Sequence, residues 1–152
     1  ENQILPYVSH TRKLVLMDKT WIIIDRINNL NDEKNKVDLT YHLNPELDYK
    51  EISSNSYCAL SGSFKVYINF FSNKPINSCF HSRNNPDEII AWETTKQGEE
   101  SPISSIVVSG DDASIYFATV IKDADSSKQF QFISENNVTY LYCKKSLNKY
   151  AL

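Results

Sequence analysis

Residues 9–27, SHTRKLVLMDKTWIIIDRI, decide the fold. Two runs rich in β-branched and aromatic residues flank the turn-like MDKT, a pattern that predicts a β-hairpin. If the turn is centred on Asp18 and Lys19, Arg12 lies opposite Asp25, and His10 lies diagonally from Asp25 on the same face. A loop one residue longer or shorter would separate these side chains, so the register is a hypothesis. The stretch therefore predicts a polar group near the open end of a hairpin whose apolar residues, Trp21 included, pack the core.

The rest of the chain is also typical of β-structure. No helical periodicity runs over a dozen residues, and short β-favouring runs alternate with polar turn segments such as SNKP and SRNNPD. The segment SGDDAS predicts a tight hairpin turn after Gly110. The predicted strands are 8–17, 20–27, 37–44, 57–60, 64–71, 76–81, 88–94, 103–109, 114–121, 128–134 and 138–143. The sequence thus predicts a single all-β domain over residues 1–152, an antiparallel β-sandwich of about eleven short strands in two sheets.

Composition and charge argue against several classes of protein. A net charge of −3, from 16 basic and 19 acidic residues, does not favour nucleic-acid binding. The sequence shows no apolar run long enough to span a membrane and no secretory-signal pattern. The chain begins at Glu1 rather than methionine, which suggests a processed protein or an excised part of one. The three cysteines are widely spaced without a CxxC pair and are expected to be small buried residues, with a single disulfide as the alternative.

His10, Asp25 and His42 form the candidate metal site. Two imidazoles and a carboxylate suit zinc with a water in the fourth position. His42 ends the alternating run VDLTYHL, and a strand placed beside the hairpin would bring it to the same polar end. The alternative is an ion pair between Arg12 and Asp25, with both histidines bonded to backbone. From the residues alone, both interpretations stay open.

The run HTRKLVLMDKTWIIIDRI, followed by LTYHLNP, resembles the C-terminal β-sandwich of heparinase II/III-like polysaccharide lyases. The later segments AWETTKQGEESPISSIVVS and SIYFATVIKDAD are similar to that family's later strands. The resemblance implies a larger, periplasmic or secreted parent in which an α/α-toroid domain precedes the sandwich. It also implies that an acidic, uronate-containing polysaccharide is cleaved by β-elimination in the cleft between the two domains.

The same resemblance implies roles for individual residues. His10, Asp25 and His42 match the positions that hold a structural zinc ion, and Arg12 would support Asp25 or turn toward the cleft. Val8 stands where several family members carry a cleft histidine. The toroid that would carry the catalytic tyrosine and asparagine is outside this sequence. No catalytic residue is therefore expected in this chain, which is not expected to cleave polysaccharide alone.

Three further residues are possible sugar contacts: His81, Arg83 and Trp92. The plainer interpretation places His81 in solvent and Trp92 in the core. Two other classes of function stay open. A non-catalytic carbohydrate-binding module predicts exposed aromatic residues in a line on one sheet face, and a purely structural sandwich predicts no metal.

Overall fold

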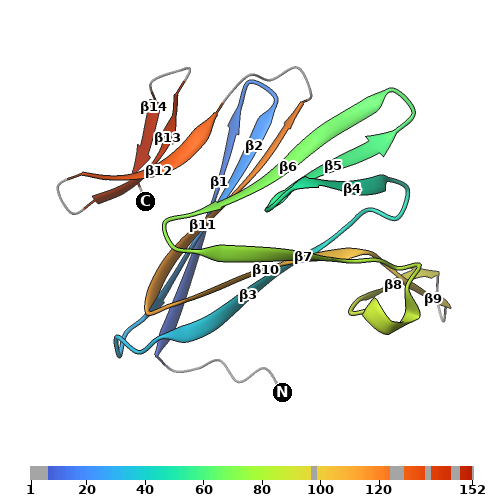
Figure 1. Cartoon of the computed structure of the whole chain (residues 1–152), viewed down its shortest axis with the longest axis horizontal. Helices are drawn as coiled ribbons and strands as arrows, with labels where there is room; N and C mark the ends of the chain where they lie inside the picture. Colours follow the sequence, from blue (N-terminus) through green and yellow to red (C-terminus); the bar gives the residue numbers. More distant parts are fainter. Residues whose placement is uncertain (1–6, 97–98, 124–128, 136–137, 145–147, 152) are drawn as a thin grey trace.

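The computed structural model describes residues 7–96, 99–123, 129–135, 138–144 and 148–151, and these residues form almost only β-strands (Figure 1). The strands are β1 Val8–Met17, β2 Thr20–Asn29, β3 Asn35–His42, β4 Asp48–Ser53, β5 Ser56–Ser61, β6 Phe64–Ser72, β7 Ile76–His81, β8 Trp92–Lys96, β9 Glu99–Pro102, β10 Ser105–Asp112, β11 Ser114–Asp123, β12 Phe130–Glu135, β13 Val138–Cys143 and β14 Asn148–Ala151. One 3₁₀ turn, η1, covers Pro86–Glu88. Within the described ranges, no helix is long and apolar enough to cross a membrane. The all-β sandwich prediction is confirmed.

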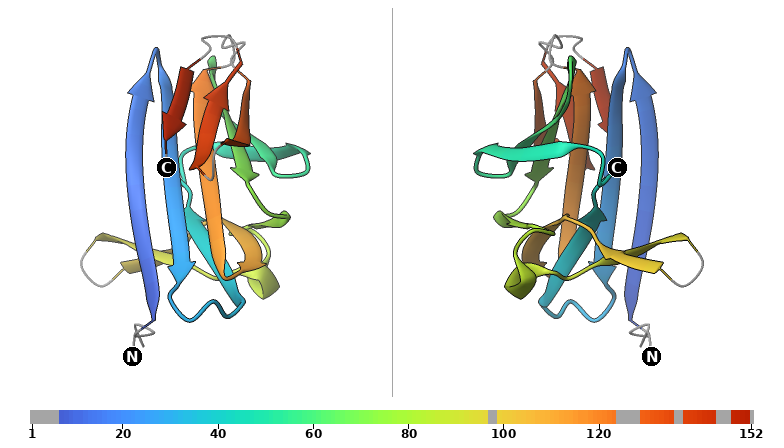
Figure 2. Two further views of the ribbon diagram at one scale, coloured as in Figure 1. Left: turned by 90° about the vertical axis from the view of Figure 1, so that its left-hand side faces the viewer. Right: turned by 90° about the vertical axis from the view of Figure 1, so that its right-hand side faces the viewer.

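The strands pair antiparallel in four sheets rather than two. A six-stranded central sheet has the order β1-β2-β11-β6-β5-β4, and a three-stranded facing sheet has the order β3-β10-β7. A three-stranded C-terminal sheet, β12-β13-β14, lies near the turn of the β1–β2 hairpin (Figures 1 and 2). Strands β8 and β9 form a separate pair.

Both faces of the central sheet bury apolar side chains. Along β11, Ile115 and Phe117 pack in the core shared with the facing sheet, whereas Ala118 and Val120 pack in a second core with the C-terminal sheet. Because side chains alternate along a strand, a strand covered on both faces is almost continuously apolar. This explains why residues 115–121, IYFATVI, carry few polar positions.

The predicted register of the first hairpin is confirmed. Arg12 pairs with Asp25, and Leu16 pairs with Trp21. The turn residues Asp18 and Lys19 have φ angles of +43° and +60°. Two successive left-handed residues are the signature of a type I′ turn, whose twist matches that of the strands.

Other strands differ from the prediction. The predicted strand 88–94 is replaced by η1 and then β8, because Asn85 accepts a hydrogen bond from the backbone N–H of Asp87 and starts a 3₁₀ turn with Pro86. Three strands escaped prediction: β4, β9 and β14. Strand β4, DYKEIS, is the last strand of the central sheet and is largely exposed, so it lacks the apolar alternation by which strands are recognised. The first residues of the predicted strand 128–134 lie outside the described ranges.

The hairpin turn predicted after Gly110 is wrong. Strand β10 continues to Asp112, and Ala113 then leads into β11, which belongs to the other sheet. Close packing, rather than a turn, explains why a glycine stands at position 110. A Cβ at Gly110 would lie 2.5 Å from Ile115 Cδ1 and 3.1 Å from Phe117 Cζ.

We predict that Gly110→Ala destabilises the fold by about 1–3 kcal/mol, because an added methyl group in a close-packed core forces its neighbours to shift. Urea denaturation followed by tyrosine fluorescence measures the change. Thr40→Ala on the exposed side of β3 is the control and should cost less than about 1 kcal/mol. Equal effects of the two substitutions would contradict the close approach of β10 to β11.

Candidate functional site

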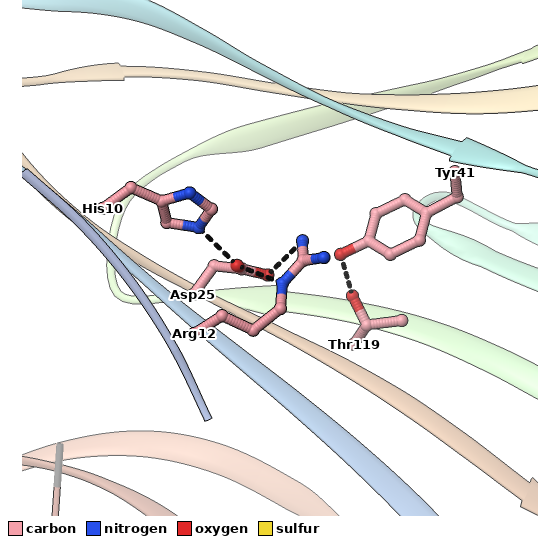
Figure 3. A network of polar contacts seen from close by, with 5 residues as sticks. All are labelled: His10, Arg12, Asp25, Tyr41 and Thr119. Atoms are coloured by element: carbon pink, nitrogen blue, oxygen red, sulfur yellow. Dashed lines mark hydrogen bonds and ion pairs between the residues drawn. The ribbon is translucent and has the colours of Figure 1, made fainter. Parts of the chain in front are cut away.

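Asp25 is a buried carboxylate held by two side chains from the neighbouring strand. It is 0% exposed. His10 Nε2 lies 2.6 Å from Asp25 Oδ1, Arg12 Nε donates to Oδ1 at 2.7 Å, and Arg12 Nη2 donates to Oδ2 at 3.2 Å (Figure 3). The two-pronged arginine contact is among the strongest hydrogen-bonding arrangements of a carboxylate. A buried negative charge is thereby compensated from β1. The ion-pair alternative predicted the Arg12–Asp25 contact, but it placed His10 on backbone, whereas His10 contacts the Asp25 carboxylate.

The protonation of this group follows from its contacts. The hydrogen bond to Asp25 raises the pKa of Arg12, so the guanidinium stays charged. Because an ionised carboxylate only accepts hydrogen bonds, His10 Nε2 carries the proton in its contact with Asp25. In the neutral ring, Nδ1 is then left as an acceptor toward solvent, where the His10 side chain is 46% exposed.

Tyr41 extends the network across the sandwich. Its hydroxyl shares a 2.6 Å hydrogen bond with Thr119 Oγ1 on β11, and its ring lies beyond the Arg12 guanidinium (Figure 3). Burial is the main cause that raises the pKa of Tyr41, and the charge of Asp25 adds to it, whereas the Thr119 hydrogen bond acts in the opposite direction. The facing sheet and the central sheet therefore meet through polar contacts as well as through the core.

A pocket of about 320 Å³ lies between the start of the β1–β2 hairpin and β3, with His10 on its wall. Its lining combines an apolar part with a polar part: Val8, Ile27, Val37, Leu39 and Ala113, then His10, Asn29, Asn35, Lys36, Asp38 and Asp112. Apolar surface with a few polar groups suits a small polar ligand such as a sugar ring. Both acidic groups of the lining already have partners, because Asp38 accepts a hydrogen bond from Ser109 Oγ and Asp112 pairs with Lys74. The Ser109 hydrogen bond is the main cause that lowers the pKa of Asp38.

The structure does not bring His42 together with His10 and Asp25. His42 ends β3 in the facing sheet, and its neighbour Tyr41 points into the sandwich, so His42 lies on the outer face. In the part of the chain that is described, no three His, Cys, Asp or Glu side chains are grouped to hold a metal ion. Both oxygens of Asp25 and the Nε2 of His10 are engaged with one another or with Arg12. The arrangement does not fit a three-ligand zinc ion, and zinc stays a prediction from the resemblance.

The remaining predicted contacts are dispersed. His81 ends β7 on the facing sheet, and the backbone N–H of Arg83, just beyond, donates to Ser104 Oγ. Trp92 is 57% exposed and Trp21 is 48% exposed, so the core interpretation of both tryptophans is wrong. All three cysteines are free, and Cys79 is exposed rather than buried.

Sequence reasoning missed Tyr41 and Thr119. The alternation of VDLTYHL placed Tyr41 on the same side as Leu39, which is a signal that its hydroxyl needs an internal partner. That the partner would be Thr119, 78 residues later in the chain, has no local signal.

This geometry defines a layered β-sandwich whose buried ion-pair network opens onto a surface pocket. No protein-family model matches the sequence, and no curated protein matches it. Solved structures do match. A heparinase III has a TM-score of 0.70 at 15% identity, over 99% of this chain and 24% of that one. The heparan sulfate lyase HepC of Pedobacter heparinus has a TM-score of 0.67 at 10% identity, over 97% of this chain and 24% of that one.

The resemblance to the sandwich of heparinase-like lyases is thus confirmed at the level of the fold. The match includes nearly the whole described chain, and it includes the C-terminal strands that the sequence motifs did not reach. This chain spans about a quarter of the length of the structures that it matches.

We predict that Arg12→Ala destabilises the fold by roughly 2–4 kcal/mol, because it leaves the Asp25 carboxylate buried with its main partner removed. The cost falls somewhat below that of a fully buried pair, since the Arg12 side chain is 45% exposed. A double-mutant cycle with Asp25→Asn should give a coupling of roughly 1–3 kcal/mol in urea denaturation. Lys36→Ala in the exposed Lys36–Asp38 pair is the control and should cost under about 1 kcal/mol. Additive effects of Arg12→Ala and Asp25→Asn would show that the two groups do not interact.

The raised pKa of Tyr41 predicts that the fold loses stability at alkaline pH. Its pKa in the folded state lies above the ordinary value of 10.0, so the unfolded chain loses the phenolic proton first as the pH rises. Stability from this group is therefore complete below about pH 10 and declines above it. Tyr41→Phe should make the decline of the urea midpoint shallower, whereas Thr119→Val, which keeps the phenol, should retain it. Parallel pH profiles for wild type and Tyr41→Phe would rule this contribution out.

Proposed function

We propose that this chain is the β-sandwich domain of a polysaccharide lyase. In the larger parent it would brace a neighbouring domain and line one wall of the cleft where a uronate-containing polysaccharide is cleaved by β-elimination. The observation that carries the proposal is the fold match over 96–99% of this chain to a part of heparinase III and heparan sulfate lyase structures.

The buried network supports a role at the cleft wall. Asp25 is hidden, whereas His10 and Arg12 are about half exposed and held in fixed orientations by it. Arg12 keeps N–H groups that Asp25 does not use, and these suit the carboxylate or sulfate of an acidic sugar. The Nδ1 of His10 accepts from a sugar hydroxyl in the same place. The chain thus positions acidic polysaccharide, and the groups that move protons belong to the rest of the parent.

An exposed apolar face on the β1–β2 hairpin supports the bracing role. Leu14 and Leu16 on β1 are 62% and 59% exposed, and Trp21 opposite Leu16 is 48% exposed. We call these three residues the hairpin patch. The opposite face of the same strands is buried, since Val15, Met17 and Ile22 pack in the core of the C-terminal sheet.

Contiguous exposed side chains of this kind mark a contact surface. The matched structures are about four times longer than this chain, so we assign the patch to a neighbouring domain of the same polypeptide.

A carbohydrate-binding module is less well supported. That alternative requires exposed aromatic rings in a line on one sheet face. The exposed tryptophans lie in different sheets instead, Trp21 on β2 of the central sheet and Trp92 on β8 of the small pair. The leucines beside Trp21 favour a protein partner over a sugar ring.

The longer polypeptide encoded by the same gene tests the function. We expect it to release unsaturated uronate products, detected by ultraviolet absorbance, from heparan sulfate or another uronate-containing polysaccharide. Arg12→Ala should lower this activity by roughly tenfold, a loss of about 1.4 kcal/mol in transition-state stabilisation. Thr40→Ala is the control and should leave activity unchanged. A parent that binds glycan without forming unsaturated products would favour the carbohydrate-binding alternative.

The hairpin patch is tested by comparing two lengths of chain. In the isolated chain, Trp21→Ser should change stability by no more than about 0.5 kcal/mol, because about half of the residue is already in solvent. In the parent it should cost roughly 1–2 kcal/mol, as the loss of a buried aromatic contact. Leu30→Ser, at a site 63% exposed and away from the patch, should be neutral in both. Equal effects of Trp21→Ser in the two lengths would remove the bracing role from this face.

A further inference from the structure

A row of three polar residues crosses the outer face of the facing sheet. Ser105 on β10 pairs with His42 on β3 and with His81 on β7. Directly opposed residues of antiparallel strands point to the same side. Ile106, the next residue of β10, lies in the core, so the row of Ser105 and the two histidines points outward. Two of the three histidines of this chain therefore lie on either side of one serine.

Ser105 is an unusual residue for this position. It is 0% exposed, and its Oγ has no hydrogen-bond partner among the described residues. A buried hydroxyl without a hydrogen-bond partner is unfavourable, because it has lost its contacts with water. No side-chain partner is found for either imidazole within the described ranges, so a polar ligand held between His42 and His81 would meet unused groups from all three strands.

The spacing suits a metal ion. Successive antiparallel strands place opposed Cα atoms roughly 4.5–5.5 Å apart, so the backbones of His42 and His81 are separated by about 10 Å. An ion midway between the two histidines would lie about half of that distance from each backbone, which is within the reach of an imidazole side chain. Neutral imidazole is a preferred ligand of zinc, nickel and copper.

We propose that His42 and His81 bind one imidazole-preferring divalent ion across β10. Water completes its coordination, since no third His, Cys, Asp or Glu is grouped with them in the described part of the chain. The Ser105 hydroxyl hydrogen-bonds to an ion-bound water or to a ligand imidazole, as groups around metal sites commonly do. The ion ties together the ends of β3 and β7, which have no direct pairing with each other. This site gives His42 a different partner from the His10 and Asp25 that the sequence predicted.

The whole chain titrated with Ni²⁺ or Zn²⁺ tests the proposal. Isothermal titration calorimetry should show one site, and binding should weaken by roughly tenfold or more in His42→Ala and in His81→Ala. His10→Ala is the matched control and should bind as the wild type does. Circular dichroism checks that each variant is folded, and both substitutions lie on the outer face of the sheet.

An NMR spectrum of the wild-type chain tests the same proposal without any substitution. In an NMR experiment that correlates imidazole carbon-bound protons with ring nitrogens, Zn²⁺ should shift two of the three histidines, and the His10 signals should not move. Loss of binding in His10→Ala and His42→Ala, with His81→Ala unaffected, would overturn the proposal in favour of the site predicted from the sequence. Absence of binding in the wild type would overturn it as well.

Discussion

The rest of the hairpin depends on the buried charge of Asp25. A carboxylate without solvent exposure needs cationic and hydrogen-bonding partners, and the observed register places Arg12 directly opposite Asp25 with His10 on the same face. The type I′ turn at Asp18 and Lys19 sets that register from the other end of the hairpin. The turn and the ion pair therefore specify the same pairing independently. A slip by one residue would move Arg12 and His10 to the other face of the hairpin and would leave the Asp25 charge without its partners.

The two faces of the central sheet carry different kinds of side chain. Toward the facing sheet, the hairpin presents the core residues Val8 and Ile27 at its open end, then the Asp25 network, and then the exposed hairpin patch near the turn. Toward the C-terminal sheet, the central sheet presents an apolar surface near the hairpin turn that includes Ile22, Ile24 and Val120. The hairpin extends beyond the facing sheet, because the pairing of β3 with β10 ends at His42 and Ser105. The hairpin patch thus lies on a face that the facing sheet does not cover. The opposite face of the same strands packs against the C-terminal sheet.

Local physics made part of this structure predictable. Alternation and turn chemistry were sufficient for the Arg12–Asp25 pairing, because both strands and their turn lie within residues 9–27. They also show which face of β2 carries Trp21, but not whether another layer covers that face, which depends on where the facing sheet ends. The predicted grouping of His42 with His10 also depended on a contact between sheets, which the sequence does not show. The sequence shows that His42 alternates with Tyr41, and only the pairing of β3 with β10 instead of β2 places Tyr41 inside and His42 outside.

A buried ion pair is weak support for stability, because apolar residues of similar shape often stabilise a fold as well or better. The position of this one is therefore informative. Arg12 and His10 each contact Asp25 and are about half exposed to solvent. His10 also forms part of the wall of the pocket between the hairpin and β3. An interior of leucine and isoleucine would hold the hairpin together equally well, but it would not fix a guanidinium and an imidazole at the surface. The cost of burying Asp25 is best explained by what its two partners present outward. Such groups are what the proposed function requires, because a domain that orients an acidic chain needs cationic and hydrogen-bonding groups in fixed positions.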